Sequence, residues 1–131
     1  MSRKRKKPKL INAQLKVGSF YNTHDGSKQG HPGRIEIVDQ QNDIYISVTT
    51  RSLSKEEFDK GKFRKDYKEL KFPTSNDIYK SLVHRRPFKG SRFDYGKEYP
   101  NLKFDKRDEI TIKGVLSKNP RLGYWYKKRK K

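Results

Sequence analysis

The stretch Arg34-Ile35-Glu36-Ile37-Val38, then five polar residues, then Ile44-Tyr45-Ile46-Ser47-Val48-Thr49-Thr50 decides the fold class. Within both apolar runs, polar and apolar side chains largely alternate, which is the period of a strand with one buried face. The polar segment 39–43 between them has the composition of a turn. The sequence therefore predicts a β-hairpin over residues 34–50.

Shorter patterns around this hairpin predict further strands and one or two helices. Residues 67–72 and 77–84 again alternate, so each segment is expected to form a strand. Residues 54–57 have the spacing of a capping box, which predicts a short helix there. Residues 105–118 fit either a helix capped by Asp105 or a strand with β-branched alternation. We therefore expect a mainly β protein with minor α, built as a small twisted antiparallel sheet or barrel.

The charge of the chain is high and unevenly distributed. The 131 residues contain 34 Lys and Arg and 15 Asp and Glu, a formal net charge of +19. Residues 1–10 hold six bases and residues 118–131 hold seven, and neither segment contains an acid. The 21 bases and 15 acids in between leave a net charge of +6. We expect a disordered basic arm at 1–10, a β-barrel domain at 11–118 and a basic aromatic tail at 119–131.

This excess of positive charge points to nucleic acid as the partner. Lys and Arg that contact phosphates release counterions, so binding is strong and depends steeply on salt. A membrane is the competing polyanion, but the ends show no amphipathic apolar face, and the chain has no apolar run of about 18 residues. The chain has no Cys, and its charged N-terminus is unlike a secretory leader. We expect a cytoplasmic protein without a membrane partner.

Residues 85–101 form a predicted long loop in which cations are interleaved with aromatic side chains. Guanidinium groups bind phosphate and aromatic faces stack on unpaired bases, so this loop is expected to contact single-stranded nucleic acid. The alternative is that the aromatic side chains pin the loop to the sheet. With the termini and the hairpin added, the predicted nucleic-acid-binding residues are Arg3, Lys4, Arg5, Lys6, Lys7, Arg34, Arg51, Arg85, Arg86, Phe88, Lys89, Arg92, Tyr95, Lys127, Lys128 and Arg129.

Residues able to carry chemistry are few. Of His24, His31 and His84, His31 is the strongest candidate, because Pro32 and Gly33 hold it at the mouth of the hairpin. An imidazole can move a proton off a 2′-hydroxyl as general acid or base, whereas the alternative is an ordinary loop histidine. The spacing of these residues matches no metal motif, and no P-loop or serine-hydrolase pattern is present. We expect neither a metal nor a cofactor.

Several short motifs of this chain occur together in one known family. They are Gly30-His31-Pro32-Gly33-Arg34 before the first strand, Asn42-Asp43 in the turn, and Thr49-Thr50-Arg51-Ser52 at the end of the second strand. A later strand runs from Ser81-Leu82-Val83 into the turn Arg85-Arg86-Pro87. In these features the chain resembles the MazF/PemK family of toxin endoribonucleases, over roughly residues 18–90.

The resemblance implies an SH3-like barrel, often a homodimer, that cleaves single-stranded RNA without a metal and pairs with an acidic antitoxin. It also implies a closing helix within 105–118. The Arg of the family's first turn falls on His31, which departs from the pattern. Either His31 acts as general acid or base while Arg34 stabilises the phosphate, or cleavage is lost and binding remains. The family's catalytic Thr falls on Thr49 or Thr50, and the basic tails are not a family feature.

Two classes of function therefore stay open. The first is a MazF/PemK-like RNA-binding barrel with endoribonuclease activity. The second is a non-catalytic protein, similar to a ribosomal protein or a mobile-element accessory protein, that binds RNA or DNA through its tails. An acidic protein partner explains the charge less economically. The sequence favours binding over catalysis and RNA over DNA.

Overall fold

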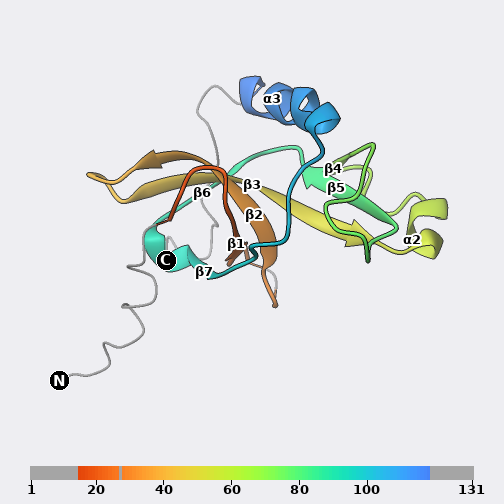
Figure 1. Ribbon diagram of the computed structural model, residues 1–131, viewed down its shortest axis with the longest axis horizontal. Coiled ribbons are helices and arrows are strands. Elements are labelled where there is room, and N and C mark those ends of the chain that lie inside the picture. The colour runs from red at the N-terminus through yellow and green to blue at the C-terminus, as the bar shows by residue number, and fades with distance from the viewer. Residues whose placement is uncertain (1–14, 27, 119–131) are drawn as a thin grey trace.

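The predicted hairpin lies at the centre of a seven-stranded antiparallel sheet with the order β4-β5-β3-β2-β1-β7, in which β6 also pairs with β3 (Figure 1). The computed structural model describes residues 15–26 and 28–118, so the predicted basic arm and tail lie outside the described residues. The strands are β1 (Phe20–Thr23), β2 (His31–Asp39), β3 (Ile44–Leu53), β4 (Tyr67–Glu69), β5 (Lys80–His84), β6 (Phe88–Gly90) and β7 (Tyr95–Glu98). The prediction of a mainly β fold with minor α is confirmed.

β2 and β3 extend further than the alternating pattern predicts. β2 begins at His31, three residues before the predicted hairpin, and β3 runs on to Leu53, three residues beyond it. The turn between them is held by Asp39, whose carboxylate accepts hydrogen bonds from the backbone N–H and the side-chain amide of Asn42. A register shift between Ile35 and Ile37 marks a β-bulge, which turns the tip of the hairpin relative to its base.

The short helix predicted from the capping box is present, and the segment 105–118, which the sequence left open between helix and strand, contains a second. α2 (Lys55–Asp59) begins with the predicted capping box, in which Ser54 and Glu57 satisfy each other's backbone N–H groups. A 3-10 turn (Lys106–Asp108) leads into α3 (Glu109–Ser117), so residues 106–117 are helical and the strand alternative is excluded. Asp108 is 1% exposed, and its carboxylate accepts hydrogen bonds from the backbone N–H groups that follow β4, at 2.8 and 2.9 Å. This buried carboxylate ties the start of α3 to the sheet.

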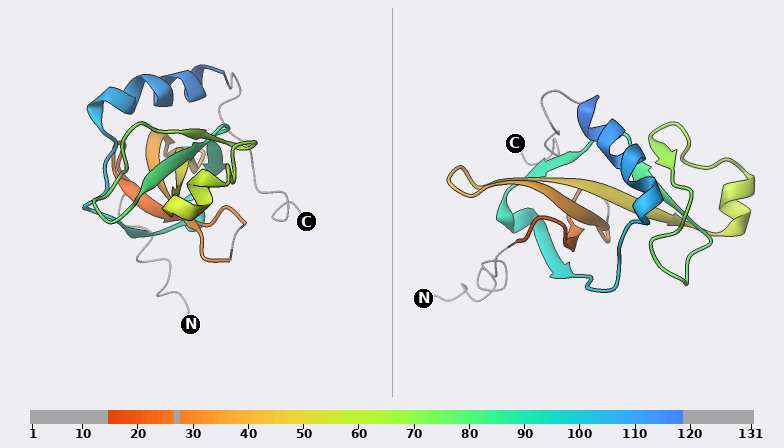
Figure 2. Two further views of the ribbon diagram at one scale, coloured as in Figure 1. Left: turned by 90° about the vertical axis from the view of Figure 1, so that its right-hand side faces the viewer. Right: turned by 45° about the horizontal axis from the view of Figure 1, so that its top comes forward.

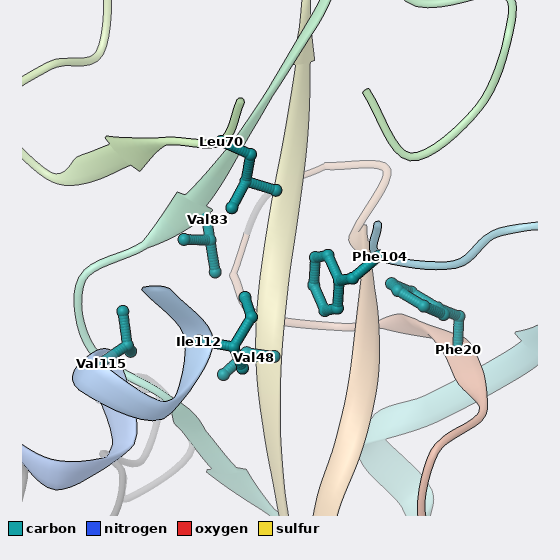
Figure 3. Close-up of a cluster of buried hydrophobic side chains, with 7 residues drawn as sticks. All are labelled: Phe20, Val48, Leu70, Val83, Phe104, Ile112 and Val115. Atoms are coloured by element: carbon teal, nitrogen blue, oxygen red, sulfur yellow. The ribbon is translucent and has the colours of Figure 1, made fainter. Parts of the chain in front are cut away.

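The sheet separates two apolar clusters, one on each face. Phe20 and Tyr21 are neighbours on β1, and they point to opposite faces because strand side chains alternate. The first cluster lies under α3 and consists of Phe20, Val48, Leu70, Val83, Phe104, Ile112 and Val115 (Figure 3). The second consists of Tyr21, Ile35, Tyr45, Phe88 and Tyr95. Because β3 is covered on both faces, six consecutive residues of it are buried.

The predicted closure into a barrel is wrong, because no ladder joins the two ends of the sheet within the described residues. β3 pairs with β5 through Thr50–Leu53 and with β6 through Tyr45–Ser47, so two strands follow one another along the same side of β3. β7 pairs with β1, and β4 pairs with β5, which leaves both of these short strands at edges (Figure 2).

The predicted long loop at 85–101 is also wrong, since this segment contains β6, a 3-10 turn (Arg92–Asp94) and β7. Its sequence lacks the β-branched alternation of the hairpin. The strands form there because partners on β3 and β1 supply the hydrogen bonds, so tertiary pairing overrides weak local propensity.

Candidate functional site

His31, the first residue of β2, is held between an acid and a base. Its Nδ1 lies 2.9 Å from the Oδ2 of Asp25, and its Nε2 lies 2.8 Å from the Nη1 of Arg51. A guanidinium can only donate hydrogen bonds, so Nε2 accepts, and Nδ1 carries the proton that is donated to Asp25. The side chains of His31 and Asp25 are 18% and 7% exposed. The imidazole is therefore fixed in orientation and still in contact with solvent.

Strand pairing brings these three residues, the Asp25–His31–Arg51 network, to one face. Thr23 pairs with His31. Asp25 lies two residues after the end of β1, and its backbone N–H donates to the Thr23 carbonyl. Gly33 of β2 pairs with Thr49 of β3 in antiparallel register. His31 lies two residues before Gly33 and Arg51 lies two residues after Thr49, so their side chains are on the same face of the sheet. A Cβ at Gly33 would lie 2.6 Å from the Thr23 hydroxyl, so only glycine fits this close approach of the strands.

Arg51 is positioned from its other side by Phe63. The guanidinium carbon of Arg51 lies 4.0 Å from the centroid of the Phe63 ring, which is a close cation–π contact. Phe63 has φ +65°, a left-handed conformation that is rare and strained for a bulky side chain. Strained backbone conformations of this kind cluster at functional sites, where they fix the position of a side chain. Here it holds an aromatic face against the arginine that contacts His31.

Tyr67 and His84 lie beside the Asp25–His31–Arg51 network. Their rings pair across β4 and β5 with centroids 4.8 Å apart. Burial raises the pKa of the Tyr67 hydroxyl, and the Asp25 charge adds to this while Arg51 opposes it. Burial also lowers the pKa of the His84 imidazole, whose Nδ1 accepts the backbone N–H of Arg86 at 3.1 Å. Both side chains are therefore held neutral at physiological pH.

Arg34, one of the predicted catalytic residues, lies on the opposite face from His31. Positions 31 and 34 on one strand differ by an odd number, so their side chains point in opposite directions. Arg34 contacts Glu109 and Glu36 and lies over the ring of Phe104, with 4.6 Å from the guanidinium carbon to the ring centroid. Burial would lower the pKa of Arg34, but the hydrogen bonds to Glu109 and Glu36 outweigh it and raise the pKa. These contacts give Arg34 a structural role.

Thr49 and Thr50 are both buried and do not form one site. Thr50 is 4% exposed, and its hydroxyl donates to the Pro32 carbonyl at 3.1 Å. Thr49 is fully buried on the other face, and its Oγ1 has no hydrogen-bond partner within the described part of the chain. Neither hydroxyl is presented to an RNA backbone.

The predicted stacking residues Phe88 and Tyr95 belong to the core. Phe88 is 0% exposed and Tyr95 is 1% exposed, so the expectation that they contact bases is wrong. The Tyr95 hydroxyl donates to the Tyr45 carbonyl at 2.9 Å and so ties β7 to β3. The alternative, that these aromatics pin the segment to the sheet, is what the structure shows.

The predicted cations are spread over the surface. Arg85, Arg86 and Arg92 are exposed and Lys89 is half-buried. Arg92 lies beside the hairpin turn, where its backbone N–H donates to Asp43, whereas Arg85 lies near the α2 end of the sheet. The terminal cations Arg3, Lys4, Arg5, Lys6, Lys7, Lys127, Lys128 and Arg129 fall outside the described residues.

Aromatic and basic side chains gather at the α2 end of the sheet, and of this set the sequence analysis predicted Arg51 alone as a binding residue. Phe58 packs against Tyr79, which is 47% exposed, and Phe63 packs against Tyr67. Cations lie within 4.0–6.0 Å of three of these rings. We call this set the aromatic–cation surface; its members are Arg51, Lys55, Phe58, Phe63, Arg64, Tyr67, Tyr79 and Lys80. The interleaving of Lys, Arg and aromatics over residues 55–67 was a usable signal for it.

Comparisons with known proteins add no assignment: the sequence matches no protein-family model and no curated protein. The relation to MazF/PemK toxins therefore stays a prediction. Among the described residues, no three or more His, Asp or Glu side chains are grouped so as to hold a metal ion. The same residues contain no helix of the length and apolarity needed to span a membrane.

Proposed function

We propose that this protein binds single-stranded RNA across the aromatic–cation surface and the adjacent Asp25–His31–Arg51 network. The observation that carries the proposal is the stacking of Arg51 on Phe63, with its Nη1 directed at His31. A guanidinium presented in this way binds phosphate, while neighbouring aromatic faces stack on bases. The net charge of +19 favours the same partner through counterion release.

A single strand suits this surface better than a duplex. Tyr79 and Phe58 form an edge-to-face pair on the surface, with ring centroids 5.6 Å apart, and cations approach both rings. Bases in a duplex already stack on each other and cannot reach such side chains. Unpaired bases can stack there, and each stacked base contributes about 1–3 kcal/mol.

A second function, metal-independent cleavage of the bound RNA, is favoured by the contact between Asp25 and His31. A buried carboxylate that fixes the tautomer of a histidine is the arrangement that prepares an imidazole for proton transfer. When a phosphate binds Arg51, the guanidinium leaves Nε2 and that nitrogen can accept a proton. DNA lacks the 2′-hydroxyl that would supply it, so this function selects RNA.

The cleavage step balances without any further reactant. His31 Nε2 takes the proton of the 2′-hydroxyl, and the 2′-oxygen forms a bond to the adjacent phosphorus. The bond from phosphorus to the 5′-oxygen breaks, the leaving oxygen takes a proton from a solvent water, and His31 returns its own proton to solvent. The products are a 2′,3′-cyclic phosphate and a 5′-hydroxyl. Arg51 stabilises the charge that develops on the phosphate oxygens.

Cleavage would fit a cytoplasmic toxin held by an acidic antitoxin, which would occupy the same basic surface. Binding without cleavage would fit an accessory or ribosomal-protein-like role. The two proposals differ only in whether Nε2 of His31 receives a proton.

Purified protein incubated with a long single-stranded RNA, with and without chelator, separates these functions. Discrete cuts that persist in chelator, vanish in His31→Ala and remain in His24→Ala support cleavage, because His24 is an exposed histidine outside the network. Intact RNA with a gel shift supports binding alone. The absence of any shift at low salt, with a duplex and a DNA strand as comparisons, would remove both proposals.

A further inference from the structure

A cavity of about 230 Å³ opens beside the network, between β4, β5 and the turn that follows α2. Its floor is aliphatic, because it is lined by Leu53 and Leu82, each only 3% exposed. Phe58 and Tyr67 add aromatic walls. Sites for small molecules measure about 300–1,000 Å³, so this smaller cavity suits one flat ring system rather than a larger ligand.

The rim of the cavity is basic. Lys62, Arg64 and Arg85 line it, and the Arg85 guanidinium donates to the Arg64 carbonyl at 3.2 Å. This bond ties the end of β5 to the turn after α2, so the rim is built by two separate segments. Three cations around an apolar floor fit a ligand that combines a flat apolar body with negative charge.

Glu69 is the one acid in the lining. It lies at the end of β4 and pairs with Leu82 of the cavity floor, so both side chains are on the same face. Among the residues that the structure describes, no hydrogen bond or ion pair engages its carboxylate. An exposed, uncommitted carboxylate in the lining, beside three cations, is an acceptor for ligand N–H groups.

We infer that this cavity binds one guanine base of the RNA strand. The inference rests on the proposed function and names its specificity. Guanine presents two adjacent donors, N1–H and the N2 amino group, which match the two oxygens of the Glu69 carboxylate. Uracil presents acceptors on either side of a single donor, so it would set two acceptors against the carboxylate. The aromatic walls hold the base, and the basic rim holds its phosphates.

Tyr67 connects the cavity to the network. It lines the cavity, packs edge-on against Phe63 and His84, and lies within reach of the Arg51 charge. A base in the cavity therefore places a neighbouring phosphate at Arg51 and His31. Cleavage, where it occurs, is then expected next to guanosine.

Fluorescence anisotropy with labelled oligouridine that carries one central guanosine, inosine or uridine tests this inference. The strands are 2′-O-methylated, so they cannot be cut through the 2′-hydroxyl. We expect the guanosine strand to bind about tenfold tighter than oligouridine, because a bidentate contact to a base edge discriminates between bases by about this factor, and the inosine strand to lie between them. Glu69→Gln should abolish this preference and leave oligouridine binding intact. Glu56→Gln is the matched control, since it removes the same charge from an exposed site on α2.

Equal affinity for all three strands, or a preference that survives Glu69→Gln, would overturn the guanine pocket while leaving RNA binding in place. Failure to bind any strand at low salt would remove the proposed function and the pocket together. Free GMP is a further competitor. Displacement of the strand by GMP at the strand's own concentration would assign the cavity to a nucleotide instead of RNA, whereas weak GMP competition supports the inference.

Discussion

Arg34 on β2 and Glu109 at the start of α3 form a bidentate ion pair, with Nη1–Oε2 and Nη2–Oε1 distances of 2.7 and 2.8 Å. The third guanidinium nitrogen, Nε, donates to Glu36 at 2.6 Å. One side chain thus joins the central hairpin to the helix that covers one apolar cluster. Arg34 holds the fold together on the face opposite His31.

Arg34→Met should destabilise the protein without altering RNA binding by the folded state. The Glu36 side chain is only 13% exposed, so loss of Arg34 leaves a nearly buried carboxylate unpaired. We expect the free energy of unfolding to fall by about 3 kcal/mol. Urea unfolding measures this change in stability. Arg107→Met is the control, because Arg107 pairs with Asp105 at an exposed site and its removal should change stability little. A folded Arg34→Met protein that no longer binds RNA would contradict the structural role.

Unlike Arg34→Met, Arg51→Met should weaken the binding of RNA by the folded protein. Arg51 carries the proposed phosphate contact, so RNA affinity at low salt should fall while the ion pair between Arg34 and Glu109 is untouched. Anisotropy with one labelled strand compares both variants directly. Equal RNA affinity of Arg51→Met and the unaltered protein would exclude Arg51 as the phosphate site.

Stability should decline as pH falls below the ordinary pKa of histidine, near 6.5, because of His84. Burial lowers the pKa of His84 in the folded state, so the unfolded chain takes up the proton first. The stabilisation that the neutral His84 contributes is complete above pH 6.5. It is lost as the pH falls through the lowered pKa that His84 has in the folded protein. Protonation would also remove the Nδ1 acceptor for the N–H of Arg86. Urea midpoints across this range should vary less in His84→Gln, whereas His24→Gln should keep the dependence.

Phe63→Gly should be more stable than Phe63→Ala, although both remove the ring. Glycine adopts φ +65° freely, while alanine is strained in this left-handed conformation. We therefore expect the free energy of unfolding of the two variants to differ by about 1 kcal/mol. Thermal unfolding of the two variants gives the comparison. Both should bind RNA more weakly, since Arg51 loses the aromatic face that positions it. An alanine variant as stable as the glycine variant would show that residue 63 is not strained in solution.

Removal of residues 1–9 and 127–131 should flatten the salt dependence of RNA binding. These segments carry eleven Lys and Arg and no acid. Each phosphate that the shortened protein no longer neutralises lowers the slope of log affinity against log salt by about 0.7 for a single strand. Titrations at several salt concentrations measure the slope. The guanosine preference should survive this truncation, because Glu69 and the cavity lie within the sheet.

The sequence predicts those parts of the fold that carry their own local signal. The alternation from Arg34 to Thr50 predicts the hairpin, and Ser54 with Glu57 predicts the start of α2. β6 and β7 carry no such signal, because Phe88 and Tyr95 are buried by contacts with distant strands. Whether a sheet closes depends on those same distant contacts, and the barrel was wrong for that reason.

The sequence predicts His31 and Arg51 as site residues, but not that they contact each other or that Asp25 joins them. His31 is engaged as a histidine with a defined tautomer, but its neighbours are Asp25 and Arg51 rather than Arg34. Because the predicted hairpin begins at Arg34, the sequence does not place His31 on the same strand, and the odd spacing between the two residues says nothing about their faces. Once β2 starts at His31, that spacing places the two on opposite faces. Asp25 and Phe63 reach the site through turns whose path no sequence pattern specifies.

The division of the interior into two clusters by a single sheet has a consequence for local opening. α3 and the Phe104 cluster can detach from one face while Tyr45, Phe88 and Tyr95 stay packed on the other. Amide hydrogens of α3 should then exchange with solvent well before those of β2 and β3. A molecule opened in this way would keep the proposed RNA-binding face, so brief exposure of half its interior need not interrupt binding.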